Sequence, residues 1–461
     1  MKRIIQWSLL LTIAGSILAF GAVQPPAYTA VEAALFLLSA MVLIKQTGDG
    51  KIDLAVPLWV LPFLGLVLIQ MIPLPGKIVS WLSPNRLFFD VQAALAPEAA
   101  HWATLSIYPH NTLFGFFKLL AYLAAFILAA YSFEPREGRS VLAPGLLVLG
   151  TLEAGYGIVQ YLTGYQKIFG FTKQFYTEEA TGTYINHNHF AGLLELVIPF
   201  AAMMVFYNLQ SRPGQGGAER WRGRPGRSGL DPRIVFYAFI LVLLLVGVVF
   251  SHSRMGMFSV LTSLILMGLL GLLGEGRRAW MIITLLVIAC SMTYAVWIGL
   301  DPVVKRFELI SPGGIENPYS RFSIWKQVDG IVKDYPGVGT GLGTFAVAFR
   351  RYQTSLLDLQ VDHAHNDYLE VATDTGITGA LLLFVPILWL LVKMILAYAG
   401  ARNPYRRSVL LACIGSATAL LIHSTMDFNL QIPANALVFA VVLGIGSKAT
   451  ISAAPPRSST A

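Results

Sequence analysis

The chain has 461 residues, of which 55% are hydrophobic and only 13% are charged, about half the charged share of a soluble domain. With a mean hydropathy of +0.63, this composition excludes a water-soluble globular protein. The net charge of +8 could indicate nucleic acid binding, but no basic run is interleaved with aromatic residues, so we expect no nucleic acid partner. Cys290 and Cys413 lie inside apolar runs and predict neither a disulfide framework nor a metal cluster.

Apolar stretches long enough to cross a bilayer recur along the whole chain. A hydrocarbon core of about 30 Å needs roughly 17 to 25 predominantly apolar residues per helix. The first stretch is longer than the apolar core of a signal peptide, so we interpret it as a membrane helix. The sequence therefore predicts an all-α polytopic membrane protein with about 12 transmembrane helices. Their expected limits are 4–22, 28–44, 54–72, 112–131, 140–162, 188–209, 234–250, 255–273, 279–298, 378–398, 409–427 and 431–447.

The distribution of lysine and arginine predicts the orientation in the membrane. Twelve alternating spans place both termini on one side, and twenty of the 33 basic residues fall in connections on that side. The positive-inside rule makes this side the cytoplasm. The cytoplasmic stretch 211–233 is dominated by Gly, Pro and Arg, which predicts a flexible linker near anionic lipid headgroups.

The outward face receives segments near 73–111, 163–187 and 299–377. The last has about 79 residues and enough aromatic side chains for a small core, so we expect a folded, functional loop with short helices rather than disorder. We divide the chain into five parts on this basis. They are transmembrane helices 1–5 with their outer loops (1–185), helices 6–9 with the basic linker (186–298), the large periplasmic loop (299–377), helices 10–12 (378–447) and a cytoplasmic tail (448–461).

The densest polar cluster of the chain is the run 361–370 (VDHAHNDYLE), inside the large loop. A metal site is disfavoured because the two histidines are two residues apart, no cysteine is nearby and no zincin spacing follows. A histidine outside the membrane suits proton abstraction from a hydroxyl, an effect typically worth about 10²- to 10⁴-fold. The alternative is that His363 and His365 are ordinary solvated or hydrogen-bonded loop residues.

Two arginines could bind an anion at the outer face. Arg254 lies in the short turn 251–256 between two apolar spans, where a snorkelling side chain is the alternative. Arg321 lies in the polar patch 318–326, where a salt bridge within the loop is the alternative. Guanidinium groups bind phosphate oxygens through two parallel hydrogen bonds. The glycine run 337–343 lacks the Lys-Ser/Thr of a phosphate loop, and we expect it to form tight turns that approach another element closely.

Three more polar features occur near the outer ends of spans: the group 186–189, which includes Asn188, the group 423–427, and Lys118 in the fourth span. Each taken alone reads as a helix cap or an interhelical hydrogen bond. Their shared depth, in the outer third of the membrane or just above it, is where a lipid-linked phosphate would lie.

Together these features resemble the O-antigen ligase and polymerase superfamily of bacterial envelope glycosyltransferases. The most specific match is His365-Asn366, nine residues and then Gly376-Ile377-Thr378-Gly379, which fits the ligase pattern H-[NSQ]-x9-G-x-x-G at the end of the large loop. The turn at Ser253-Arg254, Arg321 before an aromatic helix start, the glycine run and the Asn188 segment also resemble family features, in the same order. The resemblance is strongest from about 185 to 430.

The resemblance implies transfer of a glycan from undecaprenyl pyrophosphate to an acceptor hydroxyl, lipid A core first of all. The reaction would take place at the periplasmic face of the bacterial inner membrane, with inversion and without nucleotide sugar, ATP, metal or other cofactor. His365 would be the general base, and Arg254 and Arg321 would bind the pyrophosphate and stabilise it as it leaves. Asn366 or Asp367 would orient the imidazole. The residues expected to contact the substrate are Asn366, Asp367, His363, Asn188 and Lys118.

Two other functions remain open. A polysaccharide polymerase of the same superfamily differs mainly in its acceptor, and a related group uses protein, and no residue decides among them. A twelve-span transporter or flippase is the alternative from another class, because a basic linker after the sixth span is where a two-halves transporter places its central loop. The halves are unequal, however, and show no visible repeat. The 45–51 loop also lacks the Gly-x-x-x-Asp-Arg pattern of major facilitator proteins.

Overall fold

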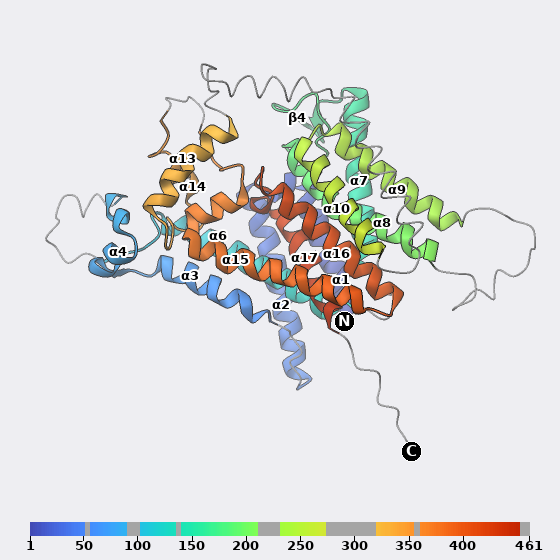
Figure 1. The fold of residues 1–461 in the computed structure, drawn as a ribbon, viewed down its shortest axis with the longest axis horizontal. Helices are drawn as coiled ribbons and strands as arrows, with labels where there is room; N and C mark the ends of the chain where they lie inside the picture. The colour runs from blue at the N-terminus through green and yellow to red at the C-terminus, as the bar shows by residue number, and fades with distance from the viewer. Residues whose placement is uncertain are drawn as a thin grey trace, which may run out of the picture.

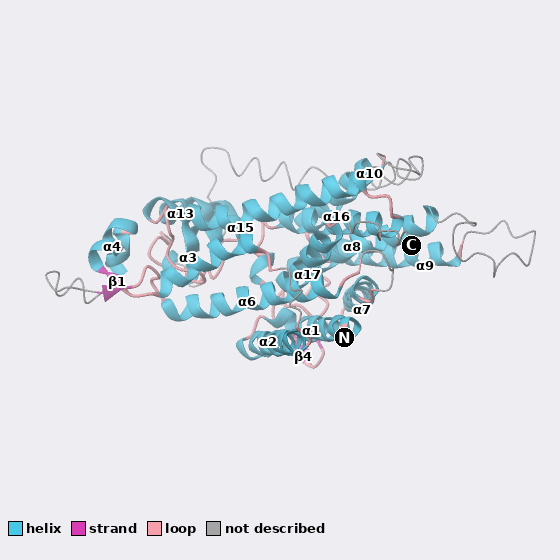
Figure 2. Ribbon diagram, turned by 90° about the horizontal axis from the view of Figure 1, so that it is seen from below, coloured by secondary structure: helices cyan, strands magenta, loops and turns pink. Residues whose placement is uncertain are grey.

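A computed structural model describes residues 1–50, 56–89, 102–134, 140–210, 231–272, 320–354 and 360–451. Helices dominate, and the four short strands form two antiparallel pairs, β1 with β2 and β3 with β4 (Figures 1 and 2). In chain order the elements are α1 (Lys2–Leu18), η1 (Phe20–Ala22), α2 (Pro25–Gly48), η2 (Leu58–Val60), α3 (Leu61–Met71), β1 (Leu74–Pro75), α4 (Gly76–Leu82), η3 (Pro84–Phe89), β2 (Trp102–Ala103), α6 (Pro109–Ser132), α7 (Leu142–Thr163), β3 (Lys167–Ile168), β4 (Phe171–Thr172), α8 (His187–Gln210), α9 (Pro232–Phe250), α10 (Arg254–Gly271), α13 (Arg321–Asp334), α14 (Phe345–Phe349), α15 (Asp367–Gly400), α16 (Pro404–His423), η5 (Asn429–Gln431) and α17 (Pro433–Thr450).

The predicted all-α polytopic class is confirmed. Among the described residues, nine helices are long and apolar enough to cross a membrane: α2, α6, α7, α8, α9, α10, α15, α16 and α17. Each coincides with a predicted span. Of the other three, α1 has 17 residues, α3 is shorter still, and the predicted span 279–298 lies outside the described residues.

The predicted span 54–72 is wrong in length, because α3 covers only 11 residues after one 3₁₀ turn. Prolines set both limits. Pro62 occupies the first turn of α3, where a missing N–H is tolerated. Ile72 precedes Pro73 and is extended, because the residue before proline is disfavoured in the helical region. Apolar composition alone therefore overestimated the length of this helix.

The bundle has two distinct ends. At the terminal end, which we define by the start of α1 and the end of α17, Lys2 contacts Glu134 after α6, and Arg406 at the start of α16 donates to the carbonyl oxygens of Ala449 and Thr450. At the opposite end, which we call the site end, the ends of α9 and α16 meet the starts of α8 and α15. Figure 1 shows α13 and α14 at this second end, away from the N-terminus.

The core of the bundle is formed by α8, α16 and α17. In α8, 89% of the most apolar stretch of 18 residues is buried, against 22% in the more apolar helix α9. This pattern is expected when the most apolar helices face lipid. Close packing depends on small and hydroxyl side chains. Ser263 on α10 donates to the carbonyl oxygen of Gly415 on α16, and Ser416 donates to that of Leu196 on α8.

The described part of the large loop has its own small core, as predicted. The buried side chains from α13 and α14 form one cluster, which includes Ile324, Val328, Ile331, Tyr335, Phe345 and Phe349. The predicted end of this loop, 377, needs refinement because α15 already begins at Asp367. Gly376 interrupts α15 with φ 69° and ψ 176°. The run 367–375 is thus a separate helical segment before the predicted span 378–398.

Candidate functional site

The site centres on Asp427, which lies directly after α16 at the site end of the bundle. Its side chain is 1% exposed, yet it has three basic neighbours from distant parts of the chain. Oδ2 lies 3.2 Å from Nη2 of Arg321 at the start of α13. Oδ1 lies 3.7 Å from Nε2 of His189 on α8 and 3.7 Å from Nδ1 of His365. One carboxylate therefore links α8, the large loop and the end of α16.

The charge of Asp427 is stabilised by these neighbours. Burial alone would raise the pKa of the carboxyl, but the imidazole groups of His189 and His365 hold the pKa well below its usual range. Asp427 is therefore a buried anion at neutral pH. His365 and Arg321 remain accessible, with 33% and 34% of their side chains exposed, so both can meet a ligand from outside.

Phe428 packs three imidazole rings around one benzyl side chain. The ring of His363 stacks on Phe428 at 4.1 Å between centroids, while His365 and His189 meet it edge-on at 4.9 Å and 4.6 Å. His363 is fixed further by Glu370, whose Oε1 lies 2.8 Å from its Nδ1. Burial lowers the pKa of His363, but the Glu370 carboxylate outweighs it and the net shift is upward.

His365 has an uncommon backbone conformation, with φ of 50°. Such values are rare for non-glycine residues and cluster at functional sites, where the surroundings must hold them. The neighbours supply that restraint. The N–H of Ala364 donates to Glu370, its carbonyl oxygen accepts from the indole of Trp325, and the Asn366 amide donates to the carbonyl oxygen of Thr425.

The glycine run 337–343 braces the same segment, as predicted from sequence. The N–H of Gly341 donates to the carbonyl oxygen of Asp374, and the N–H of Gly343 donates to the Asp374 carboxylate. A Cβ on Gly339 would collide with the backbone of Gly376, and one on Gly376 would collide with the backbone of Gly337. The first glycine of the H-[NSQ]-x9-G-x-x-G pattern, Gly376, therefore allows the glycine run to contact the backbone at the end of the helical segment that follows His365.

Arg254 occupies the first turn of α10, where Ser253 caps the helix by accepting from the N–H of Gly256. Its side chain is exposed and makes no ion pair with any residue in the described ranges. The turn before it reaches the site through Ser251, whose carbonyl oxygen contacts Nδ1 of His187 on α8. Arg254 thus lies beside the start of α8 and outside the Asp427 cluster.

The expectation that Asn366 or Asp367 orients the imidazole of His365 is wrong. Asn366 is the N-cap of α15, and its side-chain oxygen accepts from the N–H of Leu369. Asp367 is fully buried and accepts from the N–H of Leu430. Each side chain accepts a hydrogen bond from a backbone N–H group, and neither forms a hydrogen bond with His365 within the described ranges. Asp427 is the carboxylate that approaches the imidazole of His365.

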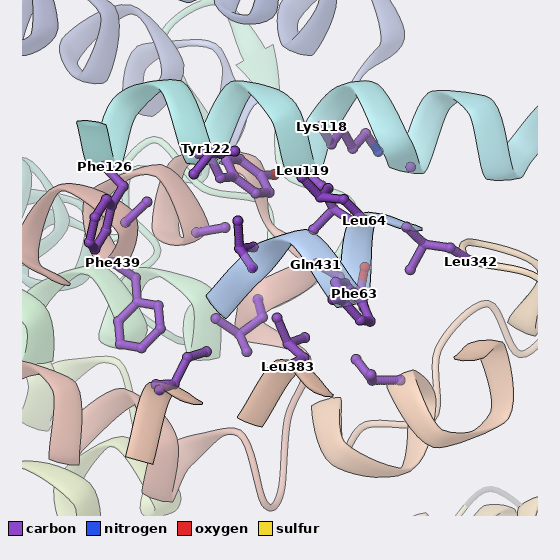
Figure 3. Close-up of a pocket in the computed structure, with 18 of the residues that line it drawn as sticks. Phe63, Leu64, Lys118, Leu119, Tyr122, Phe126, Leu342, Leu383, Gln431 and Phe439 are labelled. Atoms are coloured by element: carbon purple, nitrogen blue, oxygen red, sulfur yellow. The ribbon is translucent and has the colours of Figure 1, made fainter. Parts of the chain in front are cut away.

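Asn188 and Lys118 lie apart from the Asp427 cluster. Asn188 is half-buried in the first turn of α8, between His187 and His189, and its N–H donates to the side chain of Asn186. Lys118 lines a cavity of about 400 Å³ whose walls come mainly from α3, α6, α15 and α17. Its Nζ lies 4.2 Å from the ring centroid of Tyr28 on α2. Figure 3 shows Lys118 on α6 among the largely apolar side chains of this cavity.

A second histidine–carboxylate pair lies deeper in the bundle. Nδ1 of His423 is 3.0 Å from Oε2 of Glu195, and neither side chain is exposed. Within the described ranges, no group of three or more His, Cys, Asp or Glu side chains is arranged to hold a metal ion.

Sequence reasoning missed three members of the cluster: Asp427, His189 and Phe428. The first two belong to polar groups noted at the outer ends of two spans, and their equal depth was the available signal. The pairing itself carried no signal, because 238 positions separate the two residues in the numbering. Nothing in the local sequence marks Phe428 as the side chain that three histidines contact.

Comparison with known families agrees with this geometry. Residues 239–384 match the family model described as O-Antigen ligase. This match supports the O-antigen ligase superfamily for the chain. The matched region contains Arg254, Arg321 and His365, whereas Asp427 and the α8 residues lie outside it. No curated protein matches the chain. Together with the apolar helices, the match supports a multi-pass membrane glycosyltransferase of the O-antigen ligase or polymerase type, acting in polysaccharide biosynthesis.

Proposed function

We propose that the protein transfers a glycan from undecaprenyl pyrophosphate to a hydroxyl of lipid A core, at the periplasmic face of the bacterial inner membrane. The observation that carries this proposal is the convergence of His365 and Arg321 on the buried anion Asp427. It supports the pairing of a proposed general base, His365, with a proposed phosphate-binding group, Arg321, because both contact the same carboxylate. Both side chains are about one third exposed, as a site for a large amphiphilic substrate requires.

The proposed step is a direct displacement at the anomeric carbon. The acceptor hydroxyl forms the new C–O bond, its proton passes to His365, and the bond to undecaprenyl pyrophosphate breaks with inversion. With Nδ1 of His365 facing Asp427, Nε2 is the nitrogen that receives the proton. The 3.7 Å separation in the unliganded protein suits a contact that tightens when substrate binds.

The arginines stabilise the leaving group. Arg321 keeps part of its side chain exposed beside Asp427, and Arg254 presents an exposed side chain at the start of α10 that forms no ion pair among the described residues. Two guanidinium groups offer oriented donors to the developing pyrophosphate charge. The proposed reaction therefore needs no metal ion or other cofactor.

The remaining predicted substrate contacts are assigned by their positions. His363 orders the loop around His365 and borders the acceptor. Asn188, at the start of α8, lies on the side of the donor headgroup. The cavity beside η5 is apolar enough for a hydrocarbon chain of a lipid substrate, with Lys118 near its polar end. With the proposed site at the periplasmic face, both termini and the linker 211–233 are cytoplasmic.

The decisive experiment is transfer by the purified protein from a lipid-linked oligosaccharide. Lipid A core and a second lipid-linked unit are offered separately as acceptors. A covalent product with lipid A core supports the ligase, while elongation of the second unit would replace it with a polymerase. Movement of the donor across a vesicle membrane without any covalent product would replace both with a transporter.

A further inference from the structure

The outer loop between α7 and α8 brings an additional aromatic residue to the site. Tyr176 follows β4, and its ring lies 4.6 Å from that of His187 at the start of α8. Nδ1 of His187 contacts the carbonyl oxygen of Ser251, three residues before Arg254. The charges of both Asp427 and Arg321 reach the Tyr176 hydroxyl electrostatically. Tyr176 therefore lies beside the start of α8, within electrostatic reach of Asp427 and Arg321.

The hydroxyl of Tyr176 makes no hydrogen bond within the part of the chain that the structure describes. Two tyrosines close to it in the chain differ in this respect. Tyr165, in the same loop, donates to the carbonyl oxygen of Phe169, and Tyr184 donates to the side chain of Asn435. Burial, followed by the negative charge of Asp427, raises the pKa of Tyr176, so its hydroxyl stays protonated at neutral pH and remains a hydrogen-bond donor.

The backbone at Tyr176 is strained in the same way as at His365. Its φ is 54°, and that of His252, beside Arg254, is 53°. Non-glycine residues adopt this region at a cost that the surrounding structure must offset. Three strained residues thus lie near the proposed base and the two arginines, in three different segments. At Tyr176 this conformation holds a ring that is 37% exposed.

We propose that Tyr176 is a third phosphate-binding residue, which donates its hydroxyl to a pyrophosphate oxygen of the lipid-linked donor between Arg254 and Arg321. This inference rests on the proposed function and adds a residue from the loop 164–186 to it. A neutral donor suits this position, because two guanidinium groups already supply positive charge. A phenol adds one hydrogen bond to the second phosphate of the donor without adding a further positive charge. Its contribution falls on donor binding rather than on proton transfer.

The test compares Tyr176→Phe with Tyr165→Phe in the full-length protein. Binding of farnesyl pyrophosphate and of farnesyl monophosphate is measured by calorimetry, and the KM for the lipid-linked donor is measured in parallel. A hydrogen bond to a charged group is worth enough for us to expect roughly tenfold weaker pyrophosphate binding and a similar rise in KM for Tyr176→Phe. Monophosphate binding changes less. Tyr165→Phe keeps both constants unchanged, because that hydroxyl serves only its own loop.

Melting temperatures separate binding from folding. Tyr176→Phe removes no hydrogen bond seen among the described residues of the free protein, so we expect an unchanged melting temperature. A marked fall would overturn the proposal in favour of a structural role. If the wild type is active and Tyr176→Phe binds pyrophosphate as well as the wild type does, the proposed role of Tyr176 is overturned, while the glycosyltransferase assignment remains intact. A wild type that makes no glycan product would instead count against the proposed function.

Discussion

Two histidine–carboxylate groups in this bundle have similar chemistry and different surroundings. At the site end, Asp427 contacts His365 and Arg321, each of which is about one third exposed. One turn earlier along the chain, His423 pairs with Glu195 with both side chains fully enclosed. The pair distances are of the same order. What separates the two groups is access, since only the first has basic side chains that a ligand can reach.

The difference has a structural origin. His423 is the last residue of α16 and packs against α8 within the most buried part of the bundle. Asp427 follows after a turn, where the helix has ended and the large loop can reach it. The same residue types therefore connect helices inside the bundle and, at its end, hold the side chains that we propose to react.

The largest effect is expected for His365→Ala, which removes the proposed base. Glycan transfer should fall by about 10²- to 10⁴-fold, measured as product formed in a host that lacks its own ligase. Protein level and melting temperature should remain close to wild type, because the side chain is partly exposed. His110→Ala is the matched control, since His110 is exposed on α6 and packs on Phe114. Normal transfer by His365→Ala would remove the proposed base.

The enclosed pair should respond in the opposite manner. Removing one partner leaves a buried polar group uncompensated, so His423→Leu should lower the free energy of unfolding by roughly 3–5 kcal/mol. The double variant Glu195→Leu with His423→Leu should be less destabilised than either single variant, because no buried polar group is left behind. Denaturant unfolding monitored by fluorescence gives the values. If His423→Leu were stable but inactive, the pair would belong to the reaction and the contrast between the groups would fail.

Asp427→Asn tests whether the charge of the central carboxylate matters. The substitution keeps the shape but removes the anion that His365, His189 and Arg321 share. We expect kcat to fall roughly a hundredfold, less than the roughly 10⁴-fold loss when an aspartate hydrogen-bonded to a catalytic histidine is neutralised, because Asp427 lies 3.7 Å from the imidazole of His365. Asp362→Asn is the control, because Asp362 is exposed and contacts only Gln360 among the described residues. An unchanged kcat in Asp427→Asn would show that the imidazole needs no anion behind it.

Sequence patterns predicted the helical class, the spacing of most spans and the side chains most open to a ligand. They predicted Arg254, Arg321 and His365 because these occur in short polar runs between apolar stretches. They did not predict the buried carboxylate of Asp427 that contacts His365 and Arg321. Asp427 meets His189 only because α8 and α16 pack side by side, and local sequence carries no record of that pairing. Asn366 and Asp367 were misassigned for a related reason, since their backbone partners, the N–H groups of Leu369 and Leu430, come close only when α15 forms and η5 packs beside it.

The smallest effect is expected for Arg254→Lys. Arg254 lies beside the cluster rather than in it, so its substitution should spare the base and its support. A lysine keeps the charge but loses the planar pair of donors, and we expect about a tenfold fall in kcat/KM for the lipid-linked donor, expressed mainly as a higher KM. Arg233→Lys, in the first turn of α9 at the terminal end, should leave kcat/KM unchanged. Arg254→Ala should cost more than Arg254→Lys. Full activity in Arg254→Ala would reduce this arginine to an interfacial anchor and leave Arg321 as the single guanidinium proposed to meet the pyrophosphate.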